Sequence, residues 1–288
     1  MDQNNSETDK EVTVKNSGPV AEFFLSGWEN LVRLMASNVL FVIFNIPAMA
    51  LAVVVALVHV PLIMPLFINP DLSAGSDNAV LELFLLLMIF AVNLLVSGTL
   101  ICIGPFQAGF AQVYKDIRNK NSVSFLSSFK SGLKIGWKKG LAAMLIGLVI
   151  TPVILLAISF YLKMNSSLGT VIGVFFIVLL LAFIMVQNFA YSLMVSTDLK
   201  LGKIYKNAVL FLLIRFVPCL GAALMILLFY FVIPFILLIS ASYLTLGIFV
   251  FLYSFVVISW VQYFLTSFSG NLIDRYVTAG QAKDPEQN

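Results

Sequence analysis

Few side chains in this sequence could do chemistry. The only histidine is His59, and the two cysteines, Cys102 and Cys219, do not form a C-x-x-C pair. Metal centres built on clustered histidines or cysteines therefore lack a ligand set, and the sequence holds no nucleophile elbow, P-loop or kinase motif. The sequence indicates a non-enzymatic protein with no metal and no cofactor.

Glutamines recur in three segments that share further features. The segments read PFQAGFAQVYKDIR, VQNFAYSLMVSTDLK and VQYFLTSFSGNLIDR; each has a glutamine, then aromatic residues, then an aspartate followed by a basic residue. If these segments pack around a common axis, their amides form a polar layer that suits a polar solute such as a sugar. The layer consists of Gln107, Gln187, Asn188 and Gln262. The alternative is a set of structural hydrogen bonds between helices.

Two further pairs of polar residues fall at matching depths of a predicted helical hairpin. At about 1.5 Å per residue, Asn45 and Asn93 lie about 12 and about 16 Å from the cytoplasmic ends of their helices. His59 and Glu82 both lie about 33 Å from the same side. Each pair is either a hydrogen bond between helices or part of a polar pocket or ion path.

The elements that position these residues are predicted to be membrane helices. Hydrophobic residues make up 60% of the 288 residues and charged residues 11%, and the mean hydropathy is +1.01. A helix crosses the hydrocarbon core with about 20 mainly apolar residues. Six windows qualify: 37–62, 79–104, 139–162, 168–195, 216–239 and 244–268. We therefore predict an all-α, polytopic integral membrane protein with six transmembrane helices in one domain, 17–276, between disordered tails, 1–16 and 277–288.

The basic residues predict which way this domain faces. Of the 17 Lys and Arg residues, all except Lys163 fall in the tails or in alternate loops on one side. Basic loops stay in the cytoplasm. Both termini are therefore predicted to be cytoplasmic, in a bacterial inner membrane. The positive charge lies at membrane edges, which does not suggest nucleic acid as a partner.

Amphipathic segments precede the odd-numbered spans, over 20–35, 124–138 and 199–214. They are predicted to lie in the membrane plane, with tryptophan at the headgroup boundary and lysine toward anionic phospholipids. The residues of this interfacial anchor are Trp28, Trp137, Lys130, Lys134, Lys138 and Lys139. The other interpretation of the lysines is a surface that docks a partner protein.

The same unit is predicted three times: an amphipathic helix, then two spans, over 17–119, 120–198 and 199–276. The first span of each unit carries a proline within its apolar run, namely Pro47, Pro152 and Pro234. Every unit starts on the cytoplasmic side, unlike the inverted repeats of many secondary transporters.

The stretch IGPFQAGFAQVYKDIRNKNSVSFLSSFKSGLKIGWKKG, over about 101–140, resembles the signature of the YesL-like family of bacterial membrane proteins. In that family a glycine–proline turn follows a span, and a helix of small residues and tyrosine, a basic loop and a Phe-rich amphipathic segment come after it. The chain differs from the family by placing an extra outer loop and span between Pro47 and Gly104. The resemblance implies an association with carbohydrate uptake.

Taken together, these features favour a non-catalytic accessory or scaffold to membrane transport, with the bilayer and a carbohydrate transporter complex as partners. The alternative is a small-solute transporter or channel that uses the polar layer.

Overall fold

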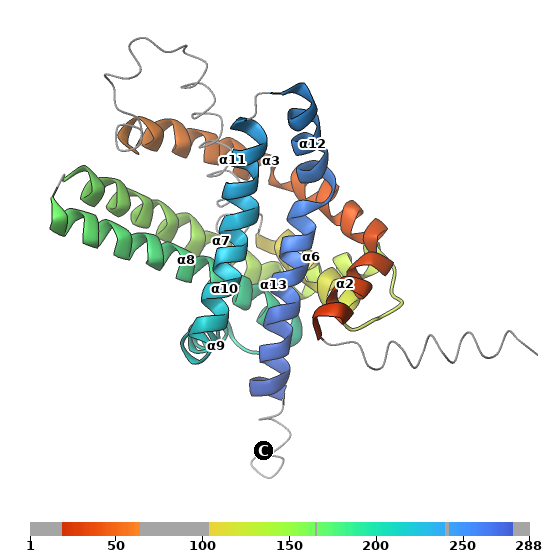
Figure 1. Cartoon of the computed structure of the whole chain (residues 1–288). Coiled ribbons are helices and arrows are strands. Elements are labelled where there is room, and N and C mark those ends of the chain that lie inside the picture. Colours follow the sequence, from red (N-terminus) through yellow and green to blue (C-terminus); the bar gives the residue numbers. More distant parts are fainter. Residues whose placement is uncertain (1–18, 64–103, 165, 240–241, 279–288) are drawn as a thin grey trace, which may run out of the picture.

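The computed structural model describes residues 19–63, 104–164, 166–239 and 242–278, and within these ranges the chain is helical without a β-strand (Figure 1). The elements are α2 (Pro19–Glu29), α3 (Leu31–Ile63), α6 (Gly104–Arg118), α7 (Phe125–Lys163), α8 (Ser167–Ser196), α9 (Leu201–Ile214), α10 (Phe216–Leu227), α11 (Ile233–Ile239), α12 (Tyr243–Phe255) and α13 (Val257–Ile273), with π-helical segments η3 (Leu228–Val232) and η4 (Asp274–Thr278).

Several of these helices are long and apolar enough to cross a membrane. Three qualify alone: Phe125–Lys163, Ser167–Ser196 and Phe216–Leu238. Two bent pairs qualify together, one with a 76° bend after Glu29 and one with a 44° bend after Phe255. The described residues thus contain three to five candidate spans and define a helical membrane protein. The window 79–104 lies almost wholly outside the described residues, so the count of six spans and the threefold repeat remain predictions.

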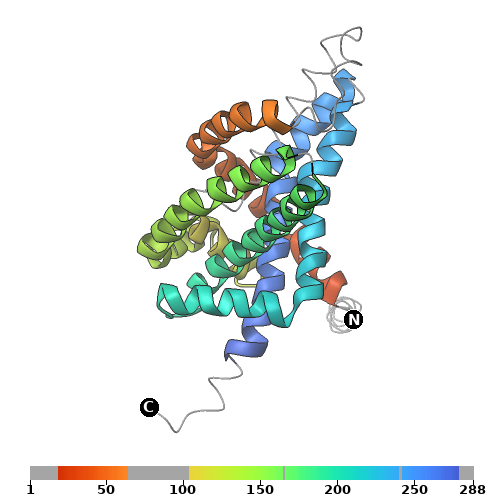
Figure 2. The same ribbon diagram turned by 90° about the vertical axis from the view of Figure 1, so that its left-hand side faces the viewer.

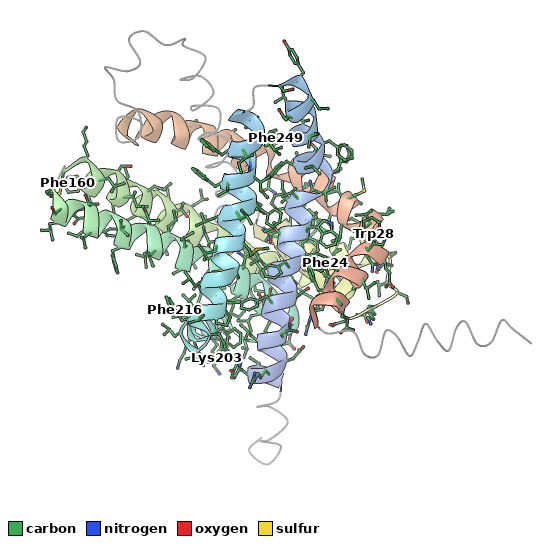
Figure 3. All side chains as sticks on the ribbon, viewed as in Figure 1. Phe24, Trp28, Phe160, Lys203, Phe216 and Phe249 are labelled. Atoms are coloured by element: carbon green, nitrogen blue, oxygen red, sulfur yellow. The ribbon has the colours of Figure 1, made fainter. Side chains whose placement is uncertain are left out.

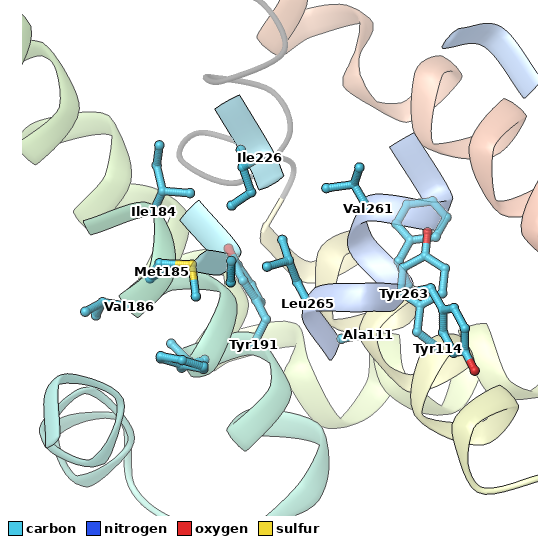
Figure 4. Packing of buried hydrophobic residues seen from close by; sticks show 14 of the residues in the cluster. Ala111, Tyr114, Ile184, Met185, Val186, Tyr191, Ile226, Val261, Tyr263 and Leu265 are labelled. Atoms are coloured by element: carbon cyan, nitrogen blue, oxygen red, sulfur yellow. The ribbon is translucent and has the colours of Figure 1, made fainter. Parts of the chain in front are cut away.

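The core forms where α6, α8 and α13 pack against one another. These helices carry the three glutamine-containing segments. Figure 4 shows Leu265 of α13 between Met185 and Tyr191 of α8 on one side and Ala111 of α6 on the other. All four side chains are buried. The α7–α8 hairpin projects away from this core (Figure 1).

The most extensive helix pair in the described part is α6 with α7, and it is built on glycine. Gly132, Gly136 and Gly140 recur every four residues on α7, so they line one face of the helix. A Cβ at Gly136 would lie 2.1 Å from the Cβ of Ala108, and one at Gly140 would lie 2.6 Å from the carbonyl oxygen of Gly104. The helices approach this closely because the small residues carry no side chain that would separate them.

This packing corrects one prediction from the sequence. The predicted in-plane helix over 124–138 is not a separate element, because α7 continues without a break from Phe125 to Lys163. Gly140, just beyond the predicted end of the amphipathic segment at 138, packs on Gly104 of α6 within the same continuous helix. At about 1.5 Å per residue the helix is about 58 Å long, well beyond a hydrocarbon core of about 30 Å. Its lysine-bearing half therefore extends past the membrane core.

The other two amphipathic segments are separate helices. Figure 2 shows α9 lying across the end of α10, and the chain turns between them at Arg215 (φ −120°, ψ 42°). Ile204, Ala208 and Phe211 form the buried face of α9, as the amphipathic pattern over 199–214 predicts. The first segment ends earlier than predicted, since α2 stops at Glu29 and the chain bends there.

Candidate functional site: a buried polar network

The structure brings two of the predicted layer residues together. The amide Nε2 of Gln107 on α6 donates a hydrogen bond to Oε1 of Gln262 on α13, at 3.1 Å. Both side chains are buried, with 4% and 2% of their surface exposed. The opposite amide oxygen, Oε1 of Gln107, is buried and has no hydrogen-bond partner among the described residues.

The third glutamine bonds elsewhere. Nε2 of Gln187 donates to the carbonyl oxygen of Ala143 on α7 at 3.3 Å, and its Oε1 accepts from the Tyr205 hydroxyl on α9 at 2.8 Å. Asn188 donates to the carbonyl oxygen of Ile184, one turn earlier in its own helix. Gln187 and Asn188 therefore tie α8 to its neighbours and to itself.

Asn38 on α3 stands at the centre of a network that the sequence did not reveal. Its Nδ2 donates to the carbonyl oxygen of Tyr253 at 2.8 Å, and its Oδ1 accepts from the backbone N–H of Ser259 at 2.8 Å. These two backbone groups flank Val256, where α12 ends and α13 begins (φ −130°, ψ −59°). A helix end leaves backbone groups without partners. Asn38, which has no exposed surface, is the hydrogen-bond partner of one such group on each side of the helix break.

Tyrosines extend this network to two more helices. The Tyr114 hydroxyl on α6 donates to Oγ of Ser259 at 3.3 Å. The Tyr253 hydroxyl donates to the carbonyl oxygen of Phe229, which lies in the π-helical segment η3. Hydrogen bonds thus link five elements in a continuous series: η3, α12, α3, α13 and α6.

The π-helical segment has a local cause. Ile233 N–H bonds to the carbonyl oxygen of Leu228, five residues back, and the next residue is Pro234. Proline has no N–H, and its ring clashes with the carbonyl group four residues earlier, which here belongs to Tyr230. The wider π-helical turn accommodates the missing N–H and avoids the clash with this carbonyl group. Such turns are frequent at functional sites.

The predicted intramembrane pairs are described only in part. Asn45 is buried; its Nδ2 donates to the carbonyl oxygen of Phe41 on the same helix, and its Oδ1 has no partner among the described residues. Asn93 and Glu82 lie outside the described residues. His59 belongs to α3, but its side chain is likewise outside the described set.

The basic end of α6 binds the carboxyl ends of α8 and α13. Lys115 Nζ donates to the carbonyl oxygen of Val195, in the last turn of α8, at 2.8 Å. Arg118 Nη2 donates to Oδ1 of Asn271 at 2.9 Å and to Asp274 at the end of α13. A cation is favourable at a helix carboxyl end. Burial lowers the pKa of Lys115, and the nearby carboxylates of Asp116 and Asp274 oppose that shift.

The predicted anchor residues lie on the outside. Trp28 is 71% exposed and Trp137 52% exposed, and Figure 3 shows Trp28 pointing away from the helices behind α2. Lys130, Lys134 and Lys138 are exposed on the side of α7 opposite the glycine face, and Lys139 is partly buried. Exposed aromatic and basic side chains such as Trp137 and the lysines of α7 suit a headgroup region.

Within the described ranges no group of three or more His, Cys, Asp or Glu side chains could hold a metal ion. Comparison of the chain with family models, curated proteins and solved structures gives no match. The fold and the network define the class of protein: a helical membrane protein with a hydrogen-bonded polar core.

Proposed function

We propose that the protein is a non-catalytic accessory or scaffold to a membrane transport process. The observation that carries this proposal is the way in which the central amides bond within the protein. Gln107 binds Gln262, Gln187 binds α7 and α9, and Asn38 binds both sides of a helix break. Amides that bond within the protein hold helices together, and fewer hydrogen-bonding groups are then left to bind a solute that passes through the bundle.

The outer surface supports the same proposal. Large apolar side chains cover the projecting α7–α8 hairpin on the outside, among them Phe160 at 64% exposure (Figure 3). Phe175 of α8 is 61% exposed. In a bilayer such side chains contact lipid or the helices of another membrane protein. A hairpin that stands away from its own core offers both faces to such a partner.

The nature of the partner comes from the sequence. The resemblance of 101–140 to the YesL-like family suggests a carbohydrate importer. The distribution of lysine and arginine supports a bacterial inner membrane with both termini in the cytoplasm. The protein would then hold or stabilise the importer and perform no reaction itself.

A transporter or channel is the second candidate, because two buried amide oxygens have no partner in the part of the chain that the structure describes. Oε1 of Gln107 and Oδ1 of Asn45 have no hydrogen-bond partner among the described residues. Buried unpaired acceptors cost free energy and are found where a ligand or water binds.

A flux measurement separates the two candidates. The purified protein is reconstituted into liposomes, and swelling is followed after a shift into iso-osmotic sugar solutions. The accessory role predicts that liposomes with the protein swell at the same rate as protein-free liposomes. Sugar-dependent swelling that Gln107→Leu abolishes would instead establish the transporter.

A further inference from the structure

A pocket outside the buried network lies between α2, α6 and α13, with a volume of about 230 Å³. Its wall includes two opposite charges, Glu22 of α2 and Arg118 of α6. Ser26, Tyr263, Ser267 and Asn271 add hydroxyl and amide groups. The pocket therefore offers donors, an acceptor carboxylate and a guanidinium within one small space.

Arg118 is held in place on the wall of this pocket. Its two hydrogen bonds, to Asn271 and Asp274, both use Nη2. The guanidinium lies directly against Gly270, where a Cβ would come within 2.3 Å of Nη1 and 2.7 Å of Cζ. An arginine has five N–H donors in a planar fork. Among the described residues no acceptor bonds to Nη1 or Nε, so these donors are available to an anionic group in the pocket.

Glu22 is fixed on the other side. Its Oε1 accepts from Nζ of Lys120 at 3.0 Å, and both side chains are about half exposed, at 52% and 51%. Lys120 follows the end of α6 in the left-handed conformation, with φ at 55°. One oxygen of the carboxylate is used by this ion pair, and the second can accept from an ammonium group.

Ser267 adds a hydroxyl to the wall of the pocket, beside Tyr263. The two side chains interact through their hydroxyl groups. A serine hydroxyl has one O–H donor and two acceptor lone pairs, so it can accept from Tyr263 and still donate to a ligand oxygen close to Arg118.

We propose that this pocket binds a phosphoethanolamine group, as a lipid headgroup or as the free compound. The phosphate takes the free donors of Arg118 and the Ser267 hydroxyl, and the ammonium group takes Glu22. The position fits a headgroup, because the last predicted span ends at 268, between Ser267 and Asn271. Phe24 and Trp28 on the outer face of α2 are exposed toward the same interface. This site is independent of the proposed accessory function.

The test uses the purified full-length protein in a neutral detergent. Thermal unfolding is measured with phosphoethanolamine, with ethanolamine and with inorganic phosphate, and native mass spectrometry compares retention of phosphatidylethanolamine and phosphatidylglycerol. Phosphoethanolamine should raise the melting temperature more than either half of the molecule, and the zwitterionic lipid should be retained more than the anionic one. Retention of the lipid without an effect of the free compound identifies the lipid as the source; an effect of both shows that the headgroup suffices.

Two variants and one control complete the test. Glu22→Gln removes the carboxylate from an exposed position, and Gly270→Ala displaces Arg118 without changing a charge. Each should weaken binding at least about tenfold, as expected for the loss of one hydrogen bond to a charged group. Glu29→Gln, an exposed change on α2 outside this pocket, should bind as the wild type does. Equal stabilisation by phosphate alone, equal retention of both lipids, or unchanged binding by Glu22→Gln would overturn the proposal.

Discussion

Replacing Gly136 by alanine should separate α6 from α7. The new Cβ would lie 2.1 Å from the Cβ of Ala108, or 1.3 Å inside the 3.4 Å at which ordinary contacts begin. A Cβ cannot rotate away, so the two backbones must move apart. Overpacking of this kind costs about 1–3 kcal/mol, and a clash between two fixed atoms belongs at the upper end. Alanine regains about 1 kcal/mol of helix propensity, which leaves a net loss of about 2 kcal/mol.

Thermal or denaturant unfolding in detergent measures this loss, and the chain offers a matched control. Gly202→Ala in α9 makes the same change where nothing lies within 4 Å, so it should stabilise by up to about 1 kcal/mol. Combining Gly136→Ala with Ala108→Gly should recover most of the loss, because the new Cβ then meets only the Cα of residue 108 at 3.7 Å. Equal stability of Gly136→Ala and Gly202→Ala would refute the close packing of these helices.

Three further changes test other parts of the structure. Asn38→Leu should destabilise by about 2 kcal/mol or more, because two buried backbone groups at the α12–α13 break each lose a partner worth about 1–3 kcal/mol; denaturant unfolding of the variant with the wild-type value would contradict this. Lys120→Gly should be about 1 kcal/mol more stable than Lys120→Ala, since both lose the ion pair with Glu22 but only glycine adopts φ 55° without strain. Burial lowers the pKa of Lys115 in the folded state. Near that pKa the folded state binds fewer protons than the unfolded state, so the free energy of unfolding rises with pH. Lys115→Met should flatten this rise when unfolding is measured at alkaline pH, and an unchanged slope would exclude Lys115 as its source.

The parts of the fold that follow from local sequence signals could be predicted. The helix Ser167–Ser196 agrees with the apolar window 168–195, and Phe216–Leu238 agrees with 216–239. The buried face of α9 follows the period of its apolar residues. In each case the length of the apolar run or its spacing is present in the segment itself. The signal is local, and so is the structure it specifies.

Features that depend on a distant partner could not be predicted in this way. The close packing of α7 on α6 depends on glycines that fit against the partner helix. Their spacing of four residues is a signal that a search for apolar residues overlooks. Asn38 lies at the start of an apolar run, and nothing nearby indicates that its amide bonds to backbone groups at the α12–α13 break. Its partner Ser259 lies 221 residues away in the sequence. Equivalent glutamines suggested one layer, but only Gln107 and Gln262 pair, because Gln187 finds partners on α7 and α9.

Affinity purification from native membranes tests the proposed accessory function most directly. The tagged full-length protein is cross-linked in its own membrane, purified, and compared with an unrelated membrane protein by mass spectrometry. The account predicts enrichment of carbohydrate-importer subunits with the wild type, and their loss when Phe160 and Phe175 on the exposed hairpin are changed to alanine. Failure to enrich any transport component over the unrelated membrane protein would contradict it.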